Sequence, residues 1–237
     1  MRKKSIDIVI PVLNEEKALP ICIEKILLYI NKNKQYNWYI VIADNGSTDS
    51  TNLIASSYVE QYKNISLITL SKRGRGRALK KAWLSSNSDV SMYMDVDLST
   101  DLNFTKLLID EITKNNSDIA VGSRLHRKSK VYDRTLMREF TSRAYNLLIH
   151  VIFPFPGFKD AQCGFKAISK NIRKNLLHKI KDNEWFFDTE LLLLSKKYGY
   201  RISEIPVIWK DDPDTRVKVI STAIKDIKGL IRVRLNI

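Results

Sequence analysis

The sequence predicts an α/β protein with a mainly parallel sheet flanked by helices. Short β-rich runs alternate with longer segments of helical periodicity through the first half of the chain, which is the signature of consecutive βαβ units. Polar segments rich in Asp, Gly and Asn follow the ends of the successive apolar runs. A length of 237 residues is that of one domain of generous size.

Each predicted element follows from this alternation. In the first half we expect strands at residues 6–12, 38–43, 65–70, 90–94 and 118–122, separated by helices at residues 16–30, 50–61, 75–85 and 102–114. The second half is less regular, with a helix at 134–152, a turn at FPFPGF (153–158), a strand at 164–168, two further helices and a strand at 200–207. We therefore expect the sheet to continue into the second half with a less regular pattern of connections.

The chain ends in a basic amphipathic segment. Apolar residues recur there at helical spacing, namely Ile220, Ala223, Ile224, Ile227, Leu230 and Ile231. Most of the cations fall elsewhere on the helical wheel, namely Lys218, Lys225, Lys228, Arg232 and Arg234. We divide the chain into a domain of residues 1–215 and a helix of residues 216–237 that could lie on a membrane surface.

Composition limits the partners and the compartment. Forty Lys and Arg against 26 Asp and Glu give a net charge of +14, which favours an anionic partner such as nucleic acid, phospholipid or a phosphorylated substrate. The cysteines, Cys22 and Cys163, lie far apart in a sequence without a secretory leader, so we expect free thiols and a cytoplasmic protein. Because no stretch approaches the roughly 20 apolar residues of a membrane span, we expect any membrane contact to be peripheral.

Candidate ligand-binding residues lie at the strand ends, where ligands bind in open α/β sheets. They are Pro11, Asn14 and Glu15 after the first strand, Asp44 in DNGSTDST, Arg73, Gly74 and Gly76 in KRGRGRA, and Asp95 and Asp97 in DVDLST. A carboxylate at 44 could accept hydrogen bonds from a nucleoside, whereas Ser47 and Asp49 are explained as helix caps. The glycines suit the approach of a diphosphate or a basic loop capping a helix. Asp95 and Asp97 suit a divalent cation, but Asp212 and Asp214 repeat their spacing.

Taken in this order, IVIPVLNEE, DNGSTDST, RGRGRA and DVDLST resemble the inverting glycosyltransferases of family 2, whose GT-A (Rossmann-like) fold has a mainly parallel mixed sheet. GSR (122–124), DAQCGFK (160–166) and WFFDTELL (185–192) are similar to the dolichyl-phosphate glucosyltransferase branch, with the mannosyltransferases less close. The resemblance covers nearly the whole chain. It implies a hexosyltransferase that moves glucose from UDP-glucose to a polyprenyl or dolichyl phosphate, with Mg²⁺ or Mn²⁺ as cofactor.

The resemblance also implies roles for these residues. The donor nucleotide would be bound by the strand-end residues Pro11, Asn14, Glu15, Asp44, Arg73, Gly74, Gly76 and Asp95, and the metal by Asp95 and Asp97. Phosphates would be bound by Arg124, Arg134, Arg138, Ser142 and Arg216, where lysine is usual at 216, and Asp97, Arg124 and Arg138 would be catalytic. Seven Lys or Arg between 124 and 143 suit a phosphate monoester acceptor. Asp188 and Glu190 could contact the sugar or form structural ion pairs, and we favour a structural or sugar-positioning role.

The predicted membrane contacts are FPFPGF and the final helix, although the same Phe and Ile residues could pack in the core. Alternative functions are transfer of mannose from GDP-mannose, a family-2 enzyme with another acceptor, a nucleotidyltransferase, or a basic membrane- or nucleic-acid-binding module. A nucleotidyltransferase would carry its Gly-rich loop after the first strand, where this chain has PVLNEE. We expect no nucleic-acid partner, because Asp95 and Asp97 without metal would repel a polyanion. The oligomeric state stays open.

Overall fold

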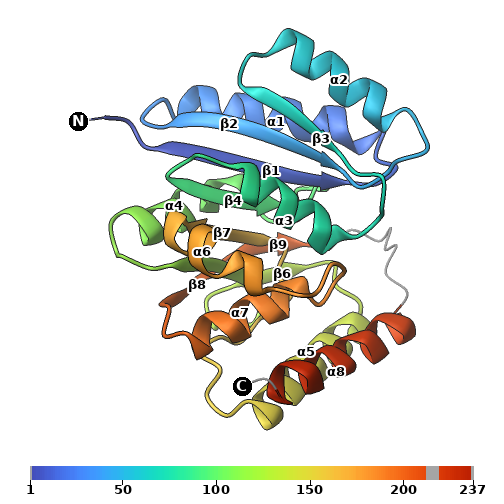
Figure 1. Cartoon of the computed structure of the whole chain (residues 1–237), viewed down its shortest axis with the longest axis vertical. Coiled ribbons are helices and arrows are strands. Elements are labelled where there is room, and N and C mark those ends of the chain that lie inside the picture. The colour runs from blue at the N-terminus through green and yellow to red at the C-terminus, as the bar shows by residue number, and fades with distance from the viewer. Residues whose placement is uncertain (1, 212–218, 236–237) are drawn as a thin grey trace.

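The computed structural model describes residues 2–211 and 219–235, which form a helix-flanked sheet of seven strands in the order β3-β2-β1-β4-β7-β5-β8 (Figure 1). The strands of this sheet are β1 (Ser5–Val12), β2 (Asn37–Asp44), β3 (Ile65–Thr69), β4 (Val90–Met94), β5 (Ile119–Ser123), β7 (Phe165–Ser169) and β8 (Ile202–Pro206). The predicted α/β class and mainly parallel sheet are confirmed. β7 is the reversed strand, since it runs antiparallel to both β4 and β5.

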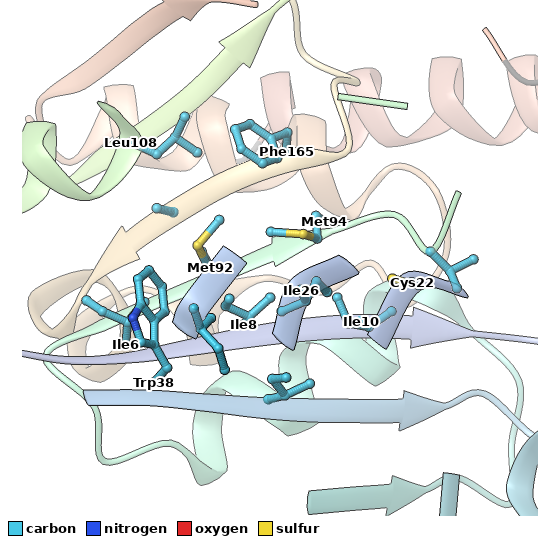
Figure 2. Close-up of a cluster of buried hydrophobic side chains, with 14 of the residues drawn as sticks. Ile6, Ile8, Ile10, Cys22, Ile26, Trp38, Met92, Met94, Leu108 and Phe165 are labelled. Carbon is cyan, nitrogen blue, oxygen red and sulfur yellow. The ribbon is translucent and has the colours of Figure 1, made fainter. Parts of the chain in front are cut away.

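Helices cover both faces of the sheet. The described helices are α1 (Ala18–Lys32), α2 (Thr51–Gln61), α3 (Arg75–Ser85), α4 (Thr105–Thr113), α5 (Leu136–Ile152), α6 (Lys170–Asn175), α7 (Phe187–Lys197) and α8 (Val219–Leu235). Alternate residues of β1 divide the core, because successive side chains in a strand point to opposite faces. Ile6, Ile8 and Ile10 belong to a buried cluster that includes residues of α1, α2 and α4 and is drawn in part in Figure 2, whereas Val9 belongs to a second cluster that includes residues of α3, α5, α6, α7 and α8.

The parallel register brings three strand ends together. Val12 of β1 pairs with Asp44 of β2, and Asp44 pairs with Thr69 of β3. The loops that follow these strands therefore leave the sheet at one edge, which is where the sequence locates the candidate ligand-binding residues.

A second, two-stranded sheet was not predicted. It pairs β6 (Lys130–Tyr132) with β9 (Ile208–Lys210), and each strand is too short to show a period of two. The expected strand at 200–207 ends at Pro206, whose ring nitrogen has no hydrogen to donate to a ladder. The chain resumes at β9, where Trp209 forms an isolated bridge with Thr100. This small sheet holds Trp209 beside the segment that follows β4.

The C-terminal helix packs on the main domain. Leu230 and Val233 of α8 are buried in the same cluster as Phe186 and Phe187. A Cβ added at Gly229 would lie 2.5 Å from the Phe186 ring, so the glycine permits this close approach. In the part of the chain that the structure describes, no helix combines the length and the apolar character needed to cross a bilayer.

Candidate active site

The loops after β1 and β2 are joined by hydrogen bonds. The amide of Asn14 donates to Oγ of Ser47 at 2.9 Å, and the amide of Glu15 donates to Oγ1 of Thr51 at 2.7 Å. In return, Oδ1 of Asn14 accepts from the amide of Thr48 at 2.7 Å. Asn14 has a φ of 55°, a conformation that Asn tolerates better than most residues. The first two predicted segments thus form one surface at the strand ends.

Asp44 stabilises this surface from beneath. Its side chain is 1% exposed. Oδ1 accepts from the amide of Ser47 at 3.0 Å, and Oδ2 accepts from Nδ2 of Asn52 at 2.8 Å. Asp44 therefore stabilises the loop, a role that the sequence analysis gave only to Ser47 and Asp49. A hydrogen bond to a nucleoside would use the remaining lone pairs of the Asp44 carboxylate.

The amides of Gly74 and Gly76 form hydrogen bonds within the protein. Their amides donate to Oδ1 of Asn45 at 2.6 Å and to the carbonyl of Glu184 at 3.1 Å, respectively, so neither is presented to a diphosphate. An added Cβ would lie 2.4 Å from the carbonyl oxygen of Asn183 at residue 74 and 2.5 Å from Cβ of Phe187 at residue 76. The glycines are required by packing against the segment 183–187. Arg73 remains exposed beside them, with Nε 3.4 Å from the carbonyl of Gly46.

The predicted metal motif, Asp95 and Asp97, follows β4. Asp95 is partly exposed, and Asp97 is exposed and accepts the amide of Ser99 at 2.8 Å. Leu98, which follows Asp97, has a φ of 52°, a backbone conformation that is strained for leucine. Among the described residues no group of three or more His, Cys, Asp and Glu is arranged to hold a metal. Two carboxylates do fit Mg²⁺ or Mn²⁺, which commonly bind one or two carboxylates together with substrate phosphates.

Arg75, which the sequence analysis did not single out, bridges two carboxylates. It donates through Nη2 to Oδ1 of Asp95 and through Nη1 to Oδ2 of Asp188, both at 2.7 Å. Oδ1 of Asp188 in turn accepts from Nζ of Lys166 at 2.8 Å and from the hydroxyl of Tyr93 at 2.6 Å. Burial raises the pKa of Asp188, but Lys166 and Arg75 outweigh it and hold the pKa below its ordinary value. The one feature of the sequence that could have singled out Arg75 is its position between Gly74 and Gly76.

Trp209 lies beside the predicted metal motif on one side and beside Arg124 and Arg134 on the other. It lines a small cavity together with Asp95, Thr100 and Gly164. The guanidinium carbons of Arg124 and Arg134 lie 5.5 and 5.7 Å from its ring centroid. Trp209 was not predicted, because it belongs to the short second sheet.

Arg124 is engaged more deeply in the fold than expected. Its Nε and Nη2 donate to the two oxygens of Asp160, both at 2.8 Å, and its amide donates to Oδ2 at 2.9 Å. Asp160 is fully buried, and although burial raises its pKa, Arg124 outweighs this and holds the pKa below its ordinary value. The predicted phosphate ligand is thus the partner of a buried carboxylate.

Three further predicted phosphate-binding residues, Arg134, Arg138 and Ser142, lie just before α5 or in its first turns. Arg134 donates to Glu139 at 2.7 Å, and its pKa is lowered by burial and by the nearby charge of Arg124. Arg138 pairs with Asp211. Ser142, one turn further along α5, is buried, and its Oγ has no hydrogen-bond partner in the part of the chain that the structure describes. Arg216, like Asp212, Asp214 and Lys218, lies outside the described residues.

Two further carboxylates, at 188 and 190, have structural partners. Both are 2% exposed. Glu190 accepts from Nη2 of Arg232 at 2.8 Å and from the amide of Asp182 at 2.7 Å, which ties α7 to α8. The favoured role for the pair was structural or sugar-positioning, and these contacts supply its structural part. Pro11 lies near the end of β1 and is partly buried.

Comparison with known proteins identifies the protein family. The model of Glycosyl transferase family 2 matches residues 7–177. Dolichyl-phosphate beta-glucosyltransferase ALG5D of Trichomonas vaginalis is 34% identical, with 98% of this chain and 75% of that protein covered. Glycosyltransferase AglD of Haloferax volcanii is 32% identical over 95% of this chain, which spans 35% of that protein. Glucosyl-3-phosphoglycerate synthase of Mycobacterium tuberculosis, solved with Mn²⁺ and UDP-glucose, shares the fold, with a TM-score of 0.73, 16% identity, and coverage of 99% and 80%.

Proposed function

The chain belongs to glycosyl transferase family 2 and is a hexosyltransferase, and we propose that it transfers glucose from UDP-glucose to the phosphate of a dolichyl or other polyprenyl lipid. An acceptor phosphate oxygen attacks the anomeric carbon, the bond to the nucleotide diphosphate breaks, and the configuration inverts. The name of the Trichomonas vaginalis relative supports the sugar and the acceptor. The observation that carries the proposal is the cationic start of α5, which adjoins the Asp95 cavity through Trp209.

The acceptor needs cations more than it needs a base. A phosphate monoester has a second pKa near 6, so its attacking oxygen is ionised at neutral pH. We assign Arg134 and Arg138 to its charge and the buried hydroxyl of Ser142 to one of its oxygens, with Arg216 as a further candidate. Arg124 supports this group through its pair with Asp160 and its contact with Trp209. Catalysis would then come mainly from positioning and charge stabilisation.

The donor is assigned to the strand-end surface. Pro11, Asn14, Glu15 and Asp44 would bind the nucleoside side, and Arg73 would approach the diphosphate. Asp95 and Asp97 would hold Mg²⁺ or Mn²⁺, which when bound neutralises the charge of the leaving diphosphate. Asp188 is not assigned as a base, because it is buried and paired with Lys166 and Arg75.

A membrane contact is supported by α5 and α8, which lie side by side (Figure 1). They and the adjoining turn carry a set of exposed apolar side chains that we call the α5/α8 apolar surface: Leu136, Met137, Phe140, Leu147, Val151, Phe155, Ile224, Ile227, Ile231 and Leu235. Exposed cations accompany it at Arg143, Lys225, Lys228 and Arg234. This combination suits a helix pair lying in an anionic lipid interface, so we propose peripheral attachment to a membrane.

The turn FPFPGF contributes less than expected to this surface. Phe153 and Phe158 are buried in the core, whereas Phe155 is exposed. The contribution of α5 was not predicted. Leu136 and Met137 of this surface lie in the same turn of α5 as Arg138, so a lipid phosphate at the interface would be within reach of the cations.

Transfer of radiolabelled sugar tests the proposal. UDP-glucose and GDP-mannose are each incubated with a short-chain polyprenyl phosphate, with and without Mn²⁺, using wild type and Asp97→Asn. We expect lipid-phase label from UDP-glucose that depends on Mn²⁺ and is lost in Asp97→Asn. Label from GDP-mannose would correct the donor. No lipid label from either donor, despite metal-dependent nucleotide binding, would contradict the proposed acceptor.

A further inference from the structure

Arg75 is held in one orientation by four side chains. Two of its nitrogens donate to Asp95 and Asp188, each at 2.7 Å. Its guanidinium carbon also lies 5.0 Å from the ring centroid of Tyr93 and 5.1 Å from that of Trp185. Because the guanidinium is planar and its donors have fixed directions, these contacts define both its position and its tilt.

The charges show which carboxylate Arg75 serves. Lys166 is fully buried, and its charge is balanced by Asp188 at 2.8 Å. Nζ of Lys166 also donates to the carbonyls of Ala161 and Cys163. That pair is therefore neutral without Arg75, and the carboxylate that balances Arg75 is Asp95. Asp188 supplies the anchor, and Asp95 at the metal motif receives the charge.

Asp95 is restrained on its other side by Gly164. Oδ2 of Asp95 lies so close to this glycine that a Cβ would approach it to 1.7 Å. Oδ1 is the oxygen that accepts from Arg75. The carboxylate is thus oriented by a hydrogen-bond donor on one side and by a steric surface on the other.

We infer that Arg75 is a positioning residue that orients Asp95 for the metal-bound donor diphosphate, with Asp188 as the anchor of Arg75. The inference rests on the proposed function, because it concerns the donor side of that site. Groups that orient a metal ligand commonly change metal affinity by about 10- to 100-fold when removed. A residue that contacted the diphosphate directly would instead change nucleotide affinity whether or not metal is present.

Arg75→Lys separates these two roles, because lysine keeps the positive charge but lacks the rigid planar fork of donors that holds Asp95 and Asp188 in the observed geometry. Mn²⁺ binding in the presence of UDP is measured by electron paramagnetic resonance, and UDP binding in EDTA is measured by calorimetry. Thermal melts monitor folding. Arg201→Lys, at an exposed arginine remote from the site, is the matched control.

We expect Arg75→Lys to weaken Mn²⁺ binding by about 10-fold or more and to leave metal-free UDP binding within about twofold, while Arg201→Lys changes neither. Unchanged Mn²⁺ binding, or an equal loss of metal-free UDP binding, would overturn the inference. If Arg75→Lys does not fold, Gly164→Ala displaces the same carboxylate from the other side and must give the same selective loss. Wild type that binds UDP and Mn²⁺ but labels no lipid would refute the proposed acceptor while this test still stands.

Discussion

Gly164 and Asp95 are in contact at the ends of two neighbouring strands, β7 and β4. The amide of Asp95 donates to the carbonyl of Gly164 at 3.2 Å, and Oδ2 of Asp95 lies where a Cβ of residue 164 would be. The flexible end of a side chain meets this position, so a substitution would displace the carboxylate rather than the backbone. A residue without a Cβ at 164 is therefore a condition for the observed orientation of Asp95.

Gly164→Ala should fold and lose metal affinity. We expect Mn²⁺ binding to weaken by about 10-fold or more, because the carboxylate must rotate away from its present position. Gly199→Ala is the control, since Gly199 has a φ of 76° and nothing within 4 Å of an added Cβ. It should lower the free energy of unfolding by about 1 kcal/mol without changing Mn²⁺ binding. Wild-type metal affinity in Gly164→Ala would contradict the contact.

Arg124→Ala should destabilise the fold. It leaves the fully buried Asp160 carboxylate without its cation, which costs about 3–5 kcal/mol when one partner of such a pair is removed. Urea unfolding measures the loss, and replacing both residues by apolar ones should cost less than Arg124→Ala alone. If Arg124→Ala keeps wild-type stability and raises the KM for the acceptor, Arg124 is a direct phosphate ligand after all.

Ser142→Ala tests the acceptor assignment without a structural cost. Among the described residues the buried hydroxyl has no hydrogen-bond partner, so its removal breaks no hydrogen bond within that part of the fold and should leave the free energy of unfolding close to that of wild type. Loss of a hydrogen bond to a charged phosphate is worth about 1.5–3 kcal/mol, so KM for the acceptor should rise about 10-fold or more with an unchanged KM for the donor. In the control Ser195→Ala, a buried hydroxyl loses its bond to the carbonyl of Leu191, which should lower stability and leave both KM values alone.

Asp226 of α8 should make stability depend on pH. Burial, with Asp182 adding to it, raises its pKa to about 7, whereas an unfolded Asp titrates near 3.9. The folded state therefore binds the extra proton between these values, and the free energy of unfolding falls as the pH rises through this window. Asp226→Asn cannot ionise, so its stabilising effect should be about 2 kcal/mol larger at pH 8 than at pH 5.

Urea unfolding at the two pH values checks this expectation. Glu24→Gln, on the exposed face of α1, is the control and should show no such difference. Oδ2 of Asp226 accepts from Nε2 of Gln162 at 3.1 Å, whereas Oδ1 has no hydrogen-bond partner among the described residues. An effect of Asp226→Asn that is equal at both pH values would show that the carboxyl is not titrating in this range.

The double variant Phe140→Glu, Leu147→Glu should reduce membrane binding. Both side chains are exposed on α5, and each would otherwise bury its carbons in the interface at about 0.8 kcal/mol per CH₂ group. We expect at least a tenfold loss of sedimentation with anionic phosphatidylglycerol vesicles and unchanged binding of UDP. Leu53→Glu with Leu84→Glu, exposed on α2 and α3, is the matched control. Equal binding of both double variants would place the lipid contact elsewhere.

Much of the fold could be predicted because its signals are local. The strands through β5 and the helices between them follow from hydrophobic periodicity, although α1 begins at Ala18 rather than at residue 16. The reversal of β7 was not predictable from local pattern, since its partners in β4 lie 71 to 79 positions away along the chain. β6 and β9 were missed because three residues carry no usable period.

The sequence by itself determined which chemistry each side chain can perform and where the candidate ligand-binding loops begin, because periodicity and strand ends are properties of neighbouring residues. The tertiary structure decided which carboxylates each arginine pairs with. Arg75 meets carboxylates 20 and 113 positions away, and Arg124 meets one 36 positions away. Burial makes such long-range pairs obligatory, since a charge removed from water must be balanced within the protein. The same type of residue therefore pairs with a buried carboxylate at Arg124, bridges Asp95 and Asp188 at Arg75 and remains exposed at Arg73.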